Sequence, residues 1–364
     1  MPEVVNSLLV TYNCGKEPPL SDQFFERFSL ELPIEPPKLI AIGFQEISSI
    51  FDGTVPPKIV NILNYFAKLL NKELVKKYQS HWIELVSVHN FGNVGLICFT
   101  IFNGADEPDN NDKAIVEKAM GIPVGQFCTS LKGGTAVKVK FPNVMSIIII
   151  VAHINAGESL YSLKRRVQDL KNILTGLKFN DGSSVSQEKD VVLMMGDLNF
   201  RASGLILDGN SSANDLGHLK GKIQKIEMDE FGKVLKVLPL LKHFKEADIK
   251  FGPSYKYAHG IILNSARIPS WCDRIIFKGN VDVKRYDTIV MGGSDHLPVV
   301  LEATIRGPLL SVESSPNVYG NDSWWKLMRA VAYFMDSIIW IALGSFSKKA
   351  ISVYMVLIII YCVW

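Results

Sequence analysis

Apolar runs of strand length recur along the first 305 residues of the chain, and most of them end in a turn or a polar cluster. Such runs are typical of buried strands, whereas apolar residues spaced three and four apart indicate helices. The pattern predicts helices at 57–77, 160–176 and 213–227. It predicts strands at 5–11, 38–44, 81–89, 94–101, 134–140, 145–152, 191–195, 275–277, 283–290 and 298–304.

The gaps between these strands are of both hairpin length and helix length, and no repeat of roughly 20–50 residues is visible. Gaps of both kinds predict a mixed sheet structure. We therefore expect an α+β domain over residues 1–305, with two sheets and with helices on the outside. Residues 306–323 are rich in Gly, Pro, Ser and Asn and have no apolar period, which is typical of a linker.

The end of the chain is strongly hydrophobic. Residues 350–364 contain no charge, and a helix of that length spans ~22 Å at ~1.5 Å per residue, compared with ~30 Å for the hydrocarbon core of a bilayer. Two lysines precede this stretch and two aromatic residues lie near its end, which suits two membrane interfaces. The pattern predicts a membrane anchor over 324–364, in which 324–347 lies in the interface or pairs with the tail as a hairpin. The alternative is a hydrophobic C-terminal helix that packs on the folded domain.

Composition places the rest of the chain among ordinary soluble enzymes. The 364 residues carry a net charge of +3, so electrostatics do not favour nucleic acid as a partner. The five cysteines are odd in number, widely spaced and without a C-x-x-C pair, which indicates a reduced, cytosolic setting and argues against a zinc site. The N-terminus has neither a basic region nor a long apolar run, so no signal peptide is expected.

The string MGDLNFR at 195–201 carries the densest candidate chemistry. It directly follows an apolar run at 191–194, so its polar side chains project from the end of a buried strand. Asp197 can act as a base, Asn199 can donate an amide N–H to an oxyanion, and Arg201 can hold an anion. The alternative is an Asp/Asn turn after a strand.

Five further polar clusters also adjoin predicted strands. They are TYNCG at 11–15, GFQE at 43–46, AHINA at 152–156, IPSWCDRII at 268–276 and SDHLP at 294–298. Together they supply Asn, Glu, His and Asp side chains, which bind divalent metals and transfer protons. Because each cluster adjoins a strand, we expect them to converge on one site.

These strings resemble a known family. MGDLNFR and PSWCDRII, together with FQE, LKGGT, AHIN, PSYKY and SDHLP, are similar to the motifs of the inositol polyphosphate 5-phosphatases, which belong to the DNase-I-like metal-dependent phosphoesterases. The resemblance covers about residues 5–305 and implies a four-layer α/β/β/α sandwich. With its hydrophobic tail, the chain most resembles the tail-anchored fungal members, which act on phosphatidylinositol 4,5-bisphosphate at the endoplasmic reticulum.

The resemblance implies a metal site. Glu46 is expected to bind Mg²⁺ as a hard carboxylate at a strand end, and Asn13 is expected to help it. Asp295 is expected to belong to the inner or outer shell of the metal. Asn13 would thus also take part in catalysis; its alternative role is that of a turn former.

The resemblance also implies catalytic roles. Asp197 would orient or deprotonate the attacking water, while Asn199, His153 and His296 would donate to the phosphoryl oxygens. Asp273 would pair with His296, fix its tautomer and favour the imidazolium. His153 has the alternative role of a satisfied core histidine. Arg274 and Arg201 are expected to be structural partners of this network.

Substrate recognition is expected at Tyr255, Lys256 and Arg267, which match the family positions that bind the 4-phosphate. Ser265 stands where many relatives carry a further Lys, which weakens the expected recognition of soluble inositol phosphates. The expected substrate is therefore a phosphoinositide lipid, phosphatidylinositol 4,5-bisphosphate, with soluble inositol trisphosphate second. An anchored enzyme meets such a lipid at high effective concentration.

The predicted function is Mg²⁺-dependent hydrolysis of the 5-phosphate of this lipid, which yields phosphatidylinositol 4-phosphate. The protein is expected to be a monomer in the membrane of the endoplasmic reticulum, with its catalytic domain facing the cytosol. The rivals are a nuclease or sphingomyelin-type phosphodiesterase of the same superfamily and a non-catalytic membrane adaptor. No His-Cys-x₅-Arg string and no G-x-x-x-x-G-K-[ST] loop is present, which excludes cysteine-dependent phosphatases and P-loop nucleotide hydrolases.

Overall fold

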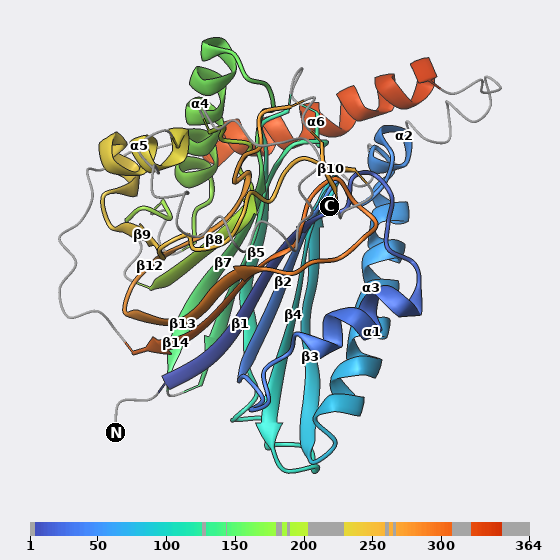
Figure 1. Cartoon of the computed structure of the whole chain (residues 1–364), viewed down its shortest axis with the longest axis vertical. Coiled ribbons are helices and arrows are strands. Elements are labelled where there is room, and N and C mark those ends of the chain that lie inside the picture. Colours follow the sequence, from blue (N-terminus) through green and yellow to red (C-terminus); the bar gives the residue numbers. More distant parts are fainter. Residues whose placement is uncertain are drawn as a thin grey trace.

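The computed structural model describes residues 4–125, 129–142, 144–179, 184–187, 190–202, 229–258, 262–264, 267–307 and 322–343. Two six-stranded sheets form the centre of the molecule, and helices flank them on both sides (Figure 1). The predicted α+β class with two sheets and external helices is confirmed.

The first sheet has the spatial order β13-β14-β1-β2-β4-β3. Its strands are β1 (Val4–Asn13), β2 (Leu39–Gln45), β3 (His81–Phe91), β4 (Val94–Asn103), β13 (Val281–Thr288) and β14 (Val299–Arg306). Only β1 and β2 are parallel neighbours in this sheet, and both lie near its middle. Their carboxyl ends therefore meet at the same edge.

The second sheet has the order β5-β6-β7-β8-β12-β9 and repeats this arrangement. Its strands are β5 (Ile115–Pro123), β6 (Gly133–Phe141), β7 (Met145–His153), β8 (Val191–Asp197), β9 (Phe244–Glu246) and β12 (Asp273–Lys278). Its only parallel pair is β7 and β8, again near the middle. A separate small hairpin consists of β10 (Tyr257–Ala258) and β11 (Ile262–Leu263).

Three apolar clusters hold these layers together. One lies between the sheets and contains residues such as Leu9, Val151 and Leu301. A second joins the first sheet to helices α1 (Asp22–Leu30) and α3 (Pro56–Lys77). A third joins the second sheet to helices α4 (Leu160–Gly176) and α5 (Glu230–Val237) and to the short 3₁₀ helix η4 (Pro239–Leu241). Each sheet is thus buried on both faces, one against the other sheet and one against helices, which produces helix, sheet, sheet and helix layers.

Local sequence explains the two helices that were predicted. Helix α3 begins at a proline, which is favourable in the first turn, and its buried residues recur at helical spacing from Ile59 to Leu74. Helix α4 has the predicted bounds and is capped by Ser159, whose hydroxyl accepts the backbone N–H of Ser162. The third predicted helix, 213–227, lies outside the described residues.

Other elements were not predicted. Strand β5 is exposed over its first five residues and buried only at its end, so no apolar run marks it. Helices α1 and α5 are short, with nine and eight residues, and gave too few periodic positions to be recognised.

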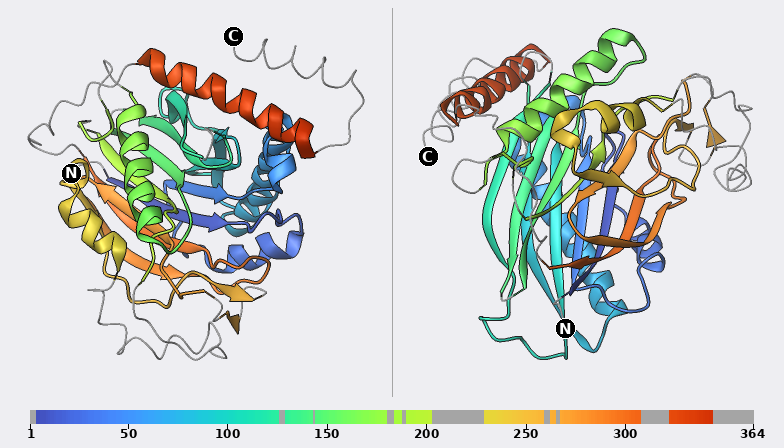
Figure 2. Two further views of the ribbon diagram at one scale, coloured as in Figure 1. Left: turned by 90° about the horizontal axis from the view of Figure 1, so that it is seen from above. Right: turned by 90° about the vertical axis from the view of Figure 1, so that its left-hand side faces the viewer.

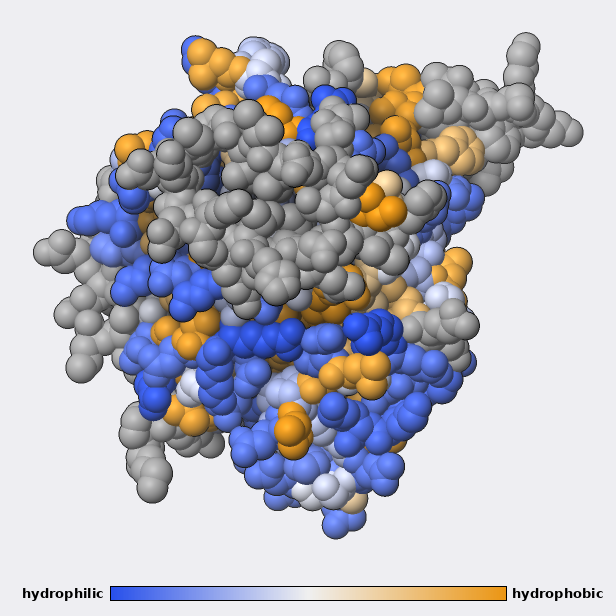
Figure 3. Space-filling model, in the orientation of Figure 1, coloured by the Kyte–Doolittle hydropathy of each residue, from blue (hydrophilic) through white to orange (hydrophobic). Residues whose placement is uncertain are grey.

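Helix α6 (Asp322–Leu343) lies across one end of the sandwich, against β5 and the short helix α2 (Ile50–Gly53) (Figure 2). Its inner face buries Ala332, Asp336 and Ser337. Its outer face exposes apolar side chains, and hydrophobic surface is visible over α6 at the top of the molecule (Figure 3). Among the described residues, no helix has the length and apolar content needed to cross a bilayer. Residues 344–364, which include the predicted membrane span, lie outside the described residues, and the division into 1–305, 306–323 and 324–364 stays a prediction.

Candidate active site

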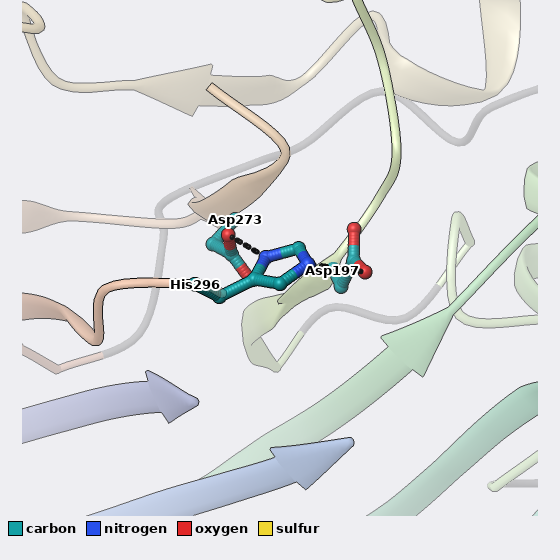
Figure 4. A group of neighbouring side chains, drawn as sticks. All are labelled: Asp197, Asp273 and His296. Atoms are coloured by element: carbon teal, nitrogen blue, oxygen red, sulfur yellow. Dashed lines mark hydrogen bonds and ion pairs between the residues drawn. The ribbon is translucent and has the colours of Figure 1, made fainter. Parts of the chain in front are cut away.

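Strand register in the second sheet brings three predicted site residues together. Asp197 ends β8, and its neighbour in the parallel strand β7 is His153. Its neighbour in the antiparallel strand β12 is Asp273. His296 lies on the segment that leads into β14, and its ring lies between the carboxylates of Asp273 and Asp197 (Figure 4).

The first sheet completes the site from the opposite side. Asn13 and Gln45 are neighbours at the ends of β1 and β2, and Glu46 follows directly. The side-chain amide of Asn13 donates to Oδ2 of Asp197 at 2.8 Å, across the space between the sheets. Oε1 of Glu46 lies 3.7 Å from Nε2 of His153. The carboxyl ends of both parallel strand pairs therefore meet at one site.

Backbone geometry at this site is unusual. Gly196 has a φ of +148°, and a Cβ there would lie 1.9 Å from the carbonyl oxygen of Ala152, so only glycine fits between β7 and β8. Glu46 and Asn199 have φ values of +45° and +53°, which non-glycine residues adopt infrequently. Such conformations persist only where surrounding structure holds them, and they cluster at functional sites.

Asp197 is almost completely buried and is held at both oxygens. Besides the bond from Asn13, its Oδ1 accepts the backbone N–H of Asn199 at 2.9 Å. Burial raises the pKa of Asp197, and the positive charge of His296 opposes that rise. The carboxylate is therefore oriented and poorly solvated, as a base for a bound water must be.

His296 is held as a cation. Its Nδ1 lies 2.8 Å from Oδ2 of Asp273, which also accepts the hydroxyl of Ser254 at 2.7 Å. Burial opposes the imidazolium, but the carboxylates of Asp273 and Asp197 outweigh it and raise the pKa of His296 to about 9. Nε2 then carries a proton and faces Oδ2 of Asp197 at 3.9 Å.

Lys132 is a site residue that the sequence did not reveal. Its Nζ lies 2.6 Å from Nε2 of His153 and donates to the carbonyl of Ile154 at 2.8 Å. Burial, and then the Lys132 charge, hold the pKa of His153 well below its usual value, so this imidazole is neutral. An ammonium group only donates, which makes Nε2 the acceptor. Lys132 belongs to the LKGGT string, but nothing in its local pattern indicates a role in chemistry.

Asn199 is oriented from two sides. Its Oδ1 accepts a hydrogen bond from Arg201 at 2.8 Å, and its Nδ2 donates to the carbonyl of Ile154 at 3.2 Å. No partner for its second Nδ2 hydrogen is found among the described residues, so that hydrogen is available for a ligand. The guanidinium of Arg201 also lies over the ring of Tyr255, at 4.7 Å from the ring centre.

A divalent cation fits the Glu46 side of the site. Potential ligand atoms of Asp197, Asp273 and His296 lie within 4.8 Å of one another, but Nδ1 of His296 and Oδ2 of Asp273 are occupied by their mutual hydrogen bond. The oxygens of Glu46 instead lie 3.7 Å from His153 and 3.7 Å from Lys16. No hydrogen bond reaches this carboxylate from the part of the chain that the structure describes, so its oxygens are available to a hard cation.

The predicted substrate residues lie around this centre at different distances. The Tyr255 ring centre is 4.6 Å from that of His296, and Nζ of Lys256 lies 3.0 Å from Oδ2 of Asp295. Asp295, a predicted metal ligand, is thus paired with a lysine. Arg267 is largely exposed and lies 3.9 Å from Glu158. Ser265 lies outside the described residues.

Comparison with known proteins places this geometry in a family. Residues 10–302 match the profile of endonuclease/exonuclease/phosphatase family 2. The chain belongs to this family.

The relatives of this family 2 chain include inositol phosphatases. It is 28% identical over 187 residues to an inositol-1,4,5-trisphosphate 5-phosphatase of Schizosaccharomyces pombe, a match that covers 50% of this chain and 16% of that protein. It is 30% identical over 207 residues to a phosphatidylinositol 4,5-bisphosphate 5-phosphatase of Saccharomyces cerevisiae, covering 55% and 21%. These relatives are therefore much longer than the matched part. The predicted resemblance to the inositol polyphosphate 5-phosphatases is confirmed.

A solved structure shares the fold. The inositol polyphosphate 5-phosphatase domain of SPsynaptojanin, crystallised with inositol (1,4)-bisphosphate and calcium ion, superposes with a TM-score of 0.66. The match covers 92% of this chain and 91% of that domain, at 21% sequence identity. This agreement supports the two-sheet architecture of the family.

Proposed function

We propose that the protein is a Mg²⁺-dependent phosphomonoesterase that removes the 5-phosphate from phosphatidylinositol 4,5-bisphosphate. The observation that carries this proposal is the composition of the buried site. An oriented carboxylate, Asp197, lies beside the charged His296, while Glu46 on the other side has no hydrogen-bond partner among the described residues. Hydrolysis of a phosphate ester needs these three parts: a base for water, donors for the phosphoryl oxygens and a cation ligand.

The chain's own residues divide the reaction between them. Asp197 accepts the proton of the attacking water, whose oxygen forms the new bond to phosphorus as the bond to the inositol 5-oxygen breaks. His296 and Asn199 donate hydrogen bonds to the phosphoryl oxygens. Asp273 keeps His296 charged. Mg²⁺ held by Glu46, with Asn13 and Asp295 nearby, would supply charge neutralisation at the phosphate and stabilise the leaving oxygen.

The role of His153 is narrower in this proposal than the family resemblance implies. Because its Nε2 accepts from Lys132, Nε2 donates to a phosphoryl oxygen only if that bond is exchanged, and the ring proton lies on Nδ1, which has no hydrogen-bond partner among the described residues. Lys132 brings a second positive charge to the same place, and we assign it to the phosphate-binding side of the site.

The lipid substrate is supported by two features. The similarity to a yeast phosphatidylinositol 4,5-bisphosphate 5-phosphatase covers 55% of this chain. Tyr255, Lys256 and Arg267 offer donors for a 4-phosphate at the rim of the site. The uncharged residues 350–364 support a membrane anchor. The proposal places this anchor in the endoplasmic reticulum, with a monomeric catalytic domain in the cytosol.

The test is phosphate release by the full-length protein from a panel of phosphoinositide vesicles and soluble inositol phosphates, with Mg²⁺ and with a chelator. We expect phosphatidylinositol 4-phosphate as the product and loss of activity on chelation. Double-stranded DNA and sphingomyelin belong in the panel, because cleavage of either diester without monoester hydrolysis would show that the rival activity is correct.

Membrane attachment has its own test. Membranes from expressing cells are extracted with carbonate, and the protein is expected to remain in the pellet. Its release into the soluble fraction would rule out the anchor while leaving the enzymatic proposal standing.

A further inference from the structure

Helix α6 is attached to the domain by polar contacts as well as apolar ones. Oδ1 of Asp336 accepts the backbone N–H of Ser130 at 3.1 Å, between residues far apart in the sequence. Arg329 donates to the carbonyl of Gly121 in β5 at 3.3 Å. Asp336 is 1% exposed and Ser130 is 1% exposed, so their hydrogen bond is shielded from water. This contact fixes the register of α6 on the strand ends.

A buried carboxyl group on an apolar helix calls for an explanation. Its transfer from water is costly, and Oδ2 of Asp336 has no hydrogen-bond partner among the described residues. Burial raises the pKa of Asp336 to about 7, although Ser130 opposes the shift. An apolar residue would pack this helix at lower cost, so the hydrogen bond to Ser130 is the feature that distinguishes aspartate here.

One path leads from Ser130 to the predicted metal ligand. The carbonyl of Ser130 accepts the backbone N–H of Asn93 at 3.4 Å. The side-chain amide of Asn93 bonds both backbone groups of Ser48, at 3.0 and 2.8 Å. Ser48 lies two residues after Glu46, and Asn93 and Ser48 are both buried. The segment that carries Glu46 is thus tied to the loop that Asp336 holds.

A shorter path leads to Lys132. This residue follows Ser130 by two positions, and its carbonyl accepts the backbone N–H groups of Val124 and Gly125 at 3.0 and 3.1 Å. Its ammonium group lies in the site, 2.6 Å from Nε2 of His153. The Ser130 contact and the Lys132 side chain therefore lie on the same short segment of chain, two residues apart.

We propose that Asp336 is a positioning residue for the active site: by holding Ser130, it fixes Lys132 and the Glu46 segment, so that turnover depends on the docking of α6. The proposal rests on the proposed phosphatase function. It makes the helix that leads into the C-terminal tail part of the catalytic unit. Because Asp336 touches neither substrate nor metal, its effect is on the placement of groups and not on chemistry at its own atoms.

The experiment compares Asp336→Asn with Asp336→Leu in the full-length protein, with soluble inositol 1,4,5-trisphosphate as substrate so that membrane binding does not enter. Asn keeps an acceptor for the Ser130 N–H, whereas Leu fills the space without one. We expect wild-type turnover from Asp336→Asn and about a tenfold lower kcat with little change in KM from Asp336→Leu, since small displacements in a catalytic site cost one to two orders of magnitude.

Two controls separate positioning from stability. Ser337→Ala changes the adjacent buried residue of α6, whose hydroxyl bonds only within its own helix in the described structure, and is expected to keep wild-type kcat. Asp336→Ala removes the acceptor without adding volume, and it is measured beside Asp336→Leu so that a folding failure of one variant does not decide the outcome. Thermal unfolding of every variant establishes that the assays use folded protein.

A double-mutant cycle with Lys132→Met gives the sharpest readout. If Asp336 acts through Lys132, adding Asp336→Leu to Lys132→Met lowers kcat by much less than tenfold. Wild-type kcat in a folded variant without the acceptor would overturn the proposal, and fully additive losses would overturn its Lys132 route. A wild-type protein that is inactive on both this substrate and phosphatidylinositol 4,5-bisphosphate vesicles would instead count against the phosphatase function, so the two failures are distinguishable.

Discussion

Asp273 and Arg274 are adjacent in the signature at the start of β12, yet they belong to two regions of opposite character. Asp273 faces the site, where it contacts His296 and Ser254 and leaves Oδ1 without a partner among the described residues. Arg274 points to the other side of the strand, as the alternation of a strand requires. There its guanidinium bonds Asp229 at 2.6 Å and Glu246 at 3.0 Å.

The two regions differ in whether their buried polar atoms have hydrogen-bond partners among the described residues. The Arg274 region is closed, in the sense that its charged groups are paired with one another. Asp229 and Glu246 both pair with the guanidinium, and the Tyr286 hydroxyl also donates to Glu246 at 2.8 Å. The site retains buried atoms without partners in the described structure, at Nδ1 of His153 and at Nε and Nη1 of Arg201. Because buried polar groups are nearly always bonded, such remainders indicate a place where a ligand supplies the missing contacts. One motif thus contributes to both a structural network and a reactive site.

The largest expected effect of a substitution is on catalysis. Asp197→Ala removes the proposed base, and we expect kcat to fall by roughly 10³–10⁴-fold, the upper part of the range for general base catalysis. The melting temperature should change little, because removal of a poorly solvated carboxylate is offset by the loss of its hydrogen bonds from Asn13 and Asn199. Steady-state kinetics and thermal unfolding measure both. Near-normal turnover in Asp197→Ala would show that this carboxylate is not the base.

The matching substitution in the closed region should affect stability instead. Arg274→Leu leaves Asp229 and Glu246 as unpaired buried carboxylates, a change that typically costs about 3–5 kcal/mol of unfolding free energy. Urea denaturation measures the loss, and the fraction that remains folded is expected to turn over normally. A stable but inactive Arg274→Leu protein would place this arginine in the reactive region.

A smaller effect is expected in a third region, the contact between Asp336 of α6 and Ser130, where the unfolding free energy should depend on pH. The pKa of Asp336 is about 7 in the folded protein and 3.8 when exposed, so between these values the folded state binds more protons. Its contribution is fully present below the lower value and is lost as pH rises through the higher one. At about 1.4 kcal/mol per pKa unit, unfolding free energy should fall by on the order of 2–3 kcal/mol from about pH 5 to 8.

Asp336→Asn is the control for that measurement, because it has no group that titrates in this range. The difference between the two unfolding curves isolates Asp336 from other buried acids such as Asp169. A difference that does not change with pH would mean that the carboxyl group is solvated in the folded protein.

The smallest expected effect is on substrate binding at the rim. Arg267→Ala should raise KM for phosphatidylinositol 4,5-bisphosphate about tenfold, the value of one hydrogen bond to a charged group, with kcat unchanged. Phosphatidylinositol 5-phosphate is the matched substrate, because it lacks the 4-phosphate. An equal rise of KM for both lipids would assign Arg267 to a different contact.

The apolar pattern predicted two sheets with external helices, and the polar clusters beside the strands predicted which residues lie together at their ends, for one physical reason. Strands that are buried on both faces read as continuous apolar runs, and polar residues directly after them lie at sheet ends. This rule located Asn13, Glu46, His153 and Asp197, and the register then placed them side by side. Their individual roles stay predictions until the variants are assayed.

The residues that were missed lack such a signal. Strand β5 is half exposed, and helices α1 and α5 are short. Lys132 lies in a loop and reaches His153 only through the pairing of β6 with β7. The buried role of Asp336 was missed because its helix is apolar and was assigned to the membrane anchor. These features depend on contacts between distant segments, which local patterns do not record.

Gly196 gives the site an unexpected vulnerability. It has no side chain and therefore no chemistry, yet even a methyl group there would collide with the carbonyl of Ala152 and wedge β7 from β8. Gly196→Ala would retain every acid, amide and imidazole of the site and still separate His153 from Asp197. In a mutational scan scored by activity, substitutions of Gly196 would then be as damaging as substitutions of Asp197, although glycine has no side chain that could react.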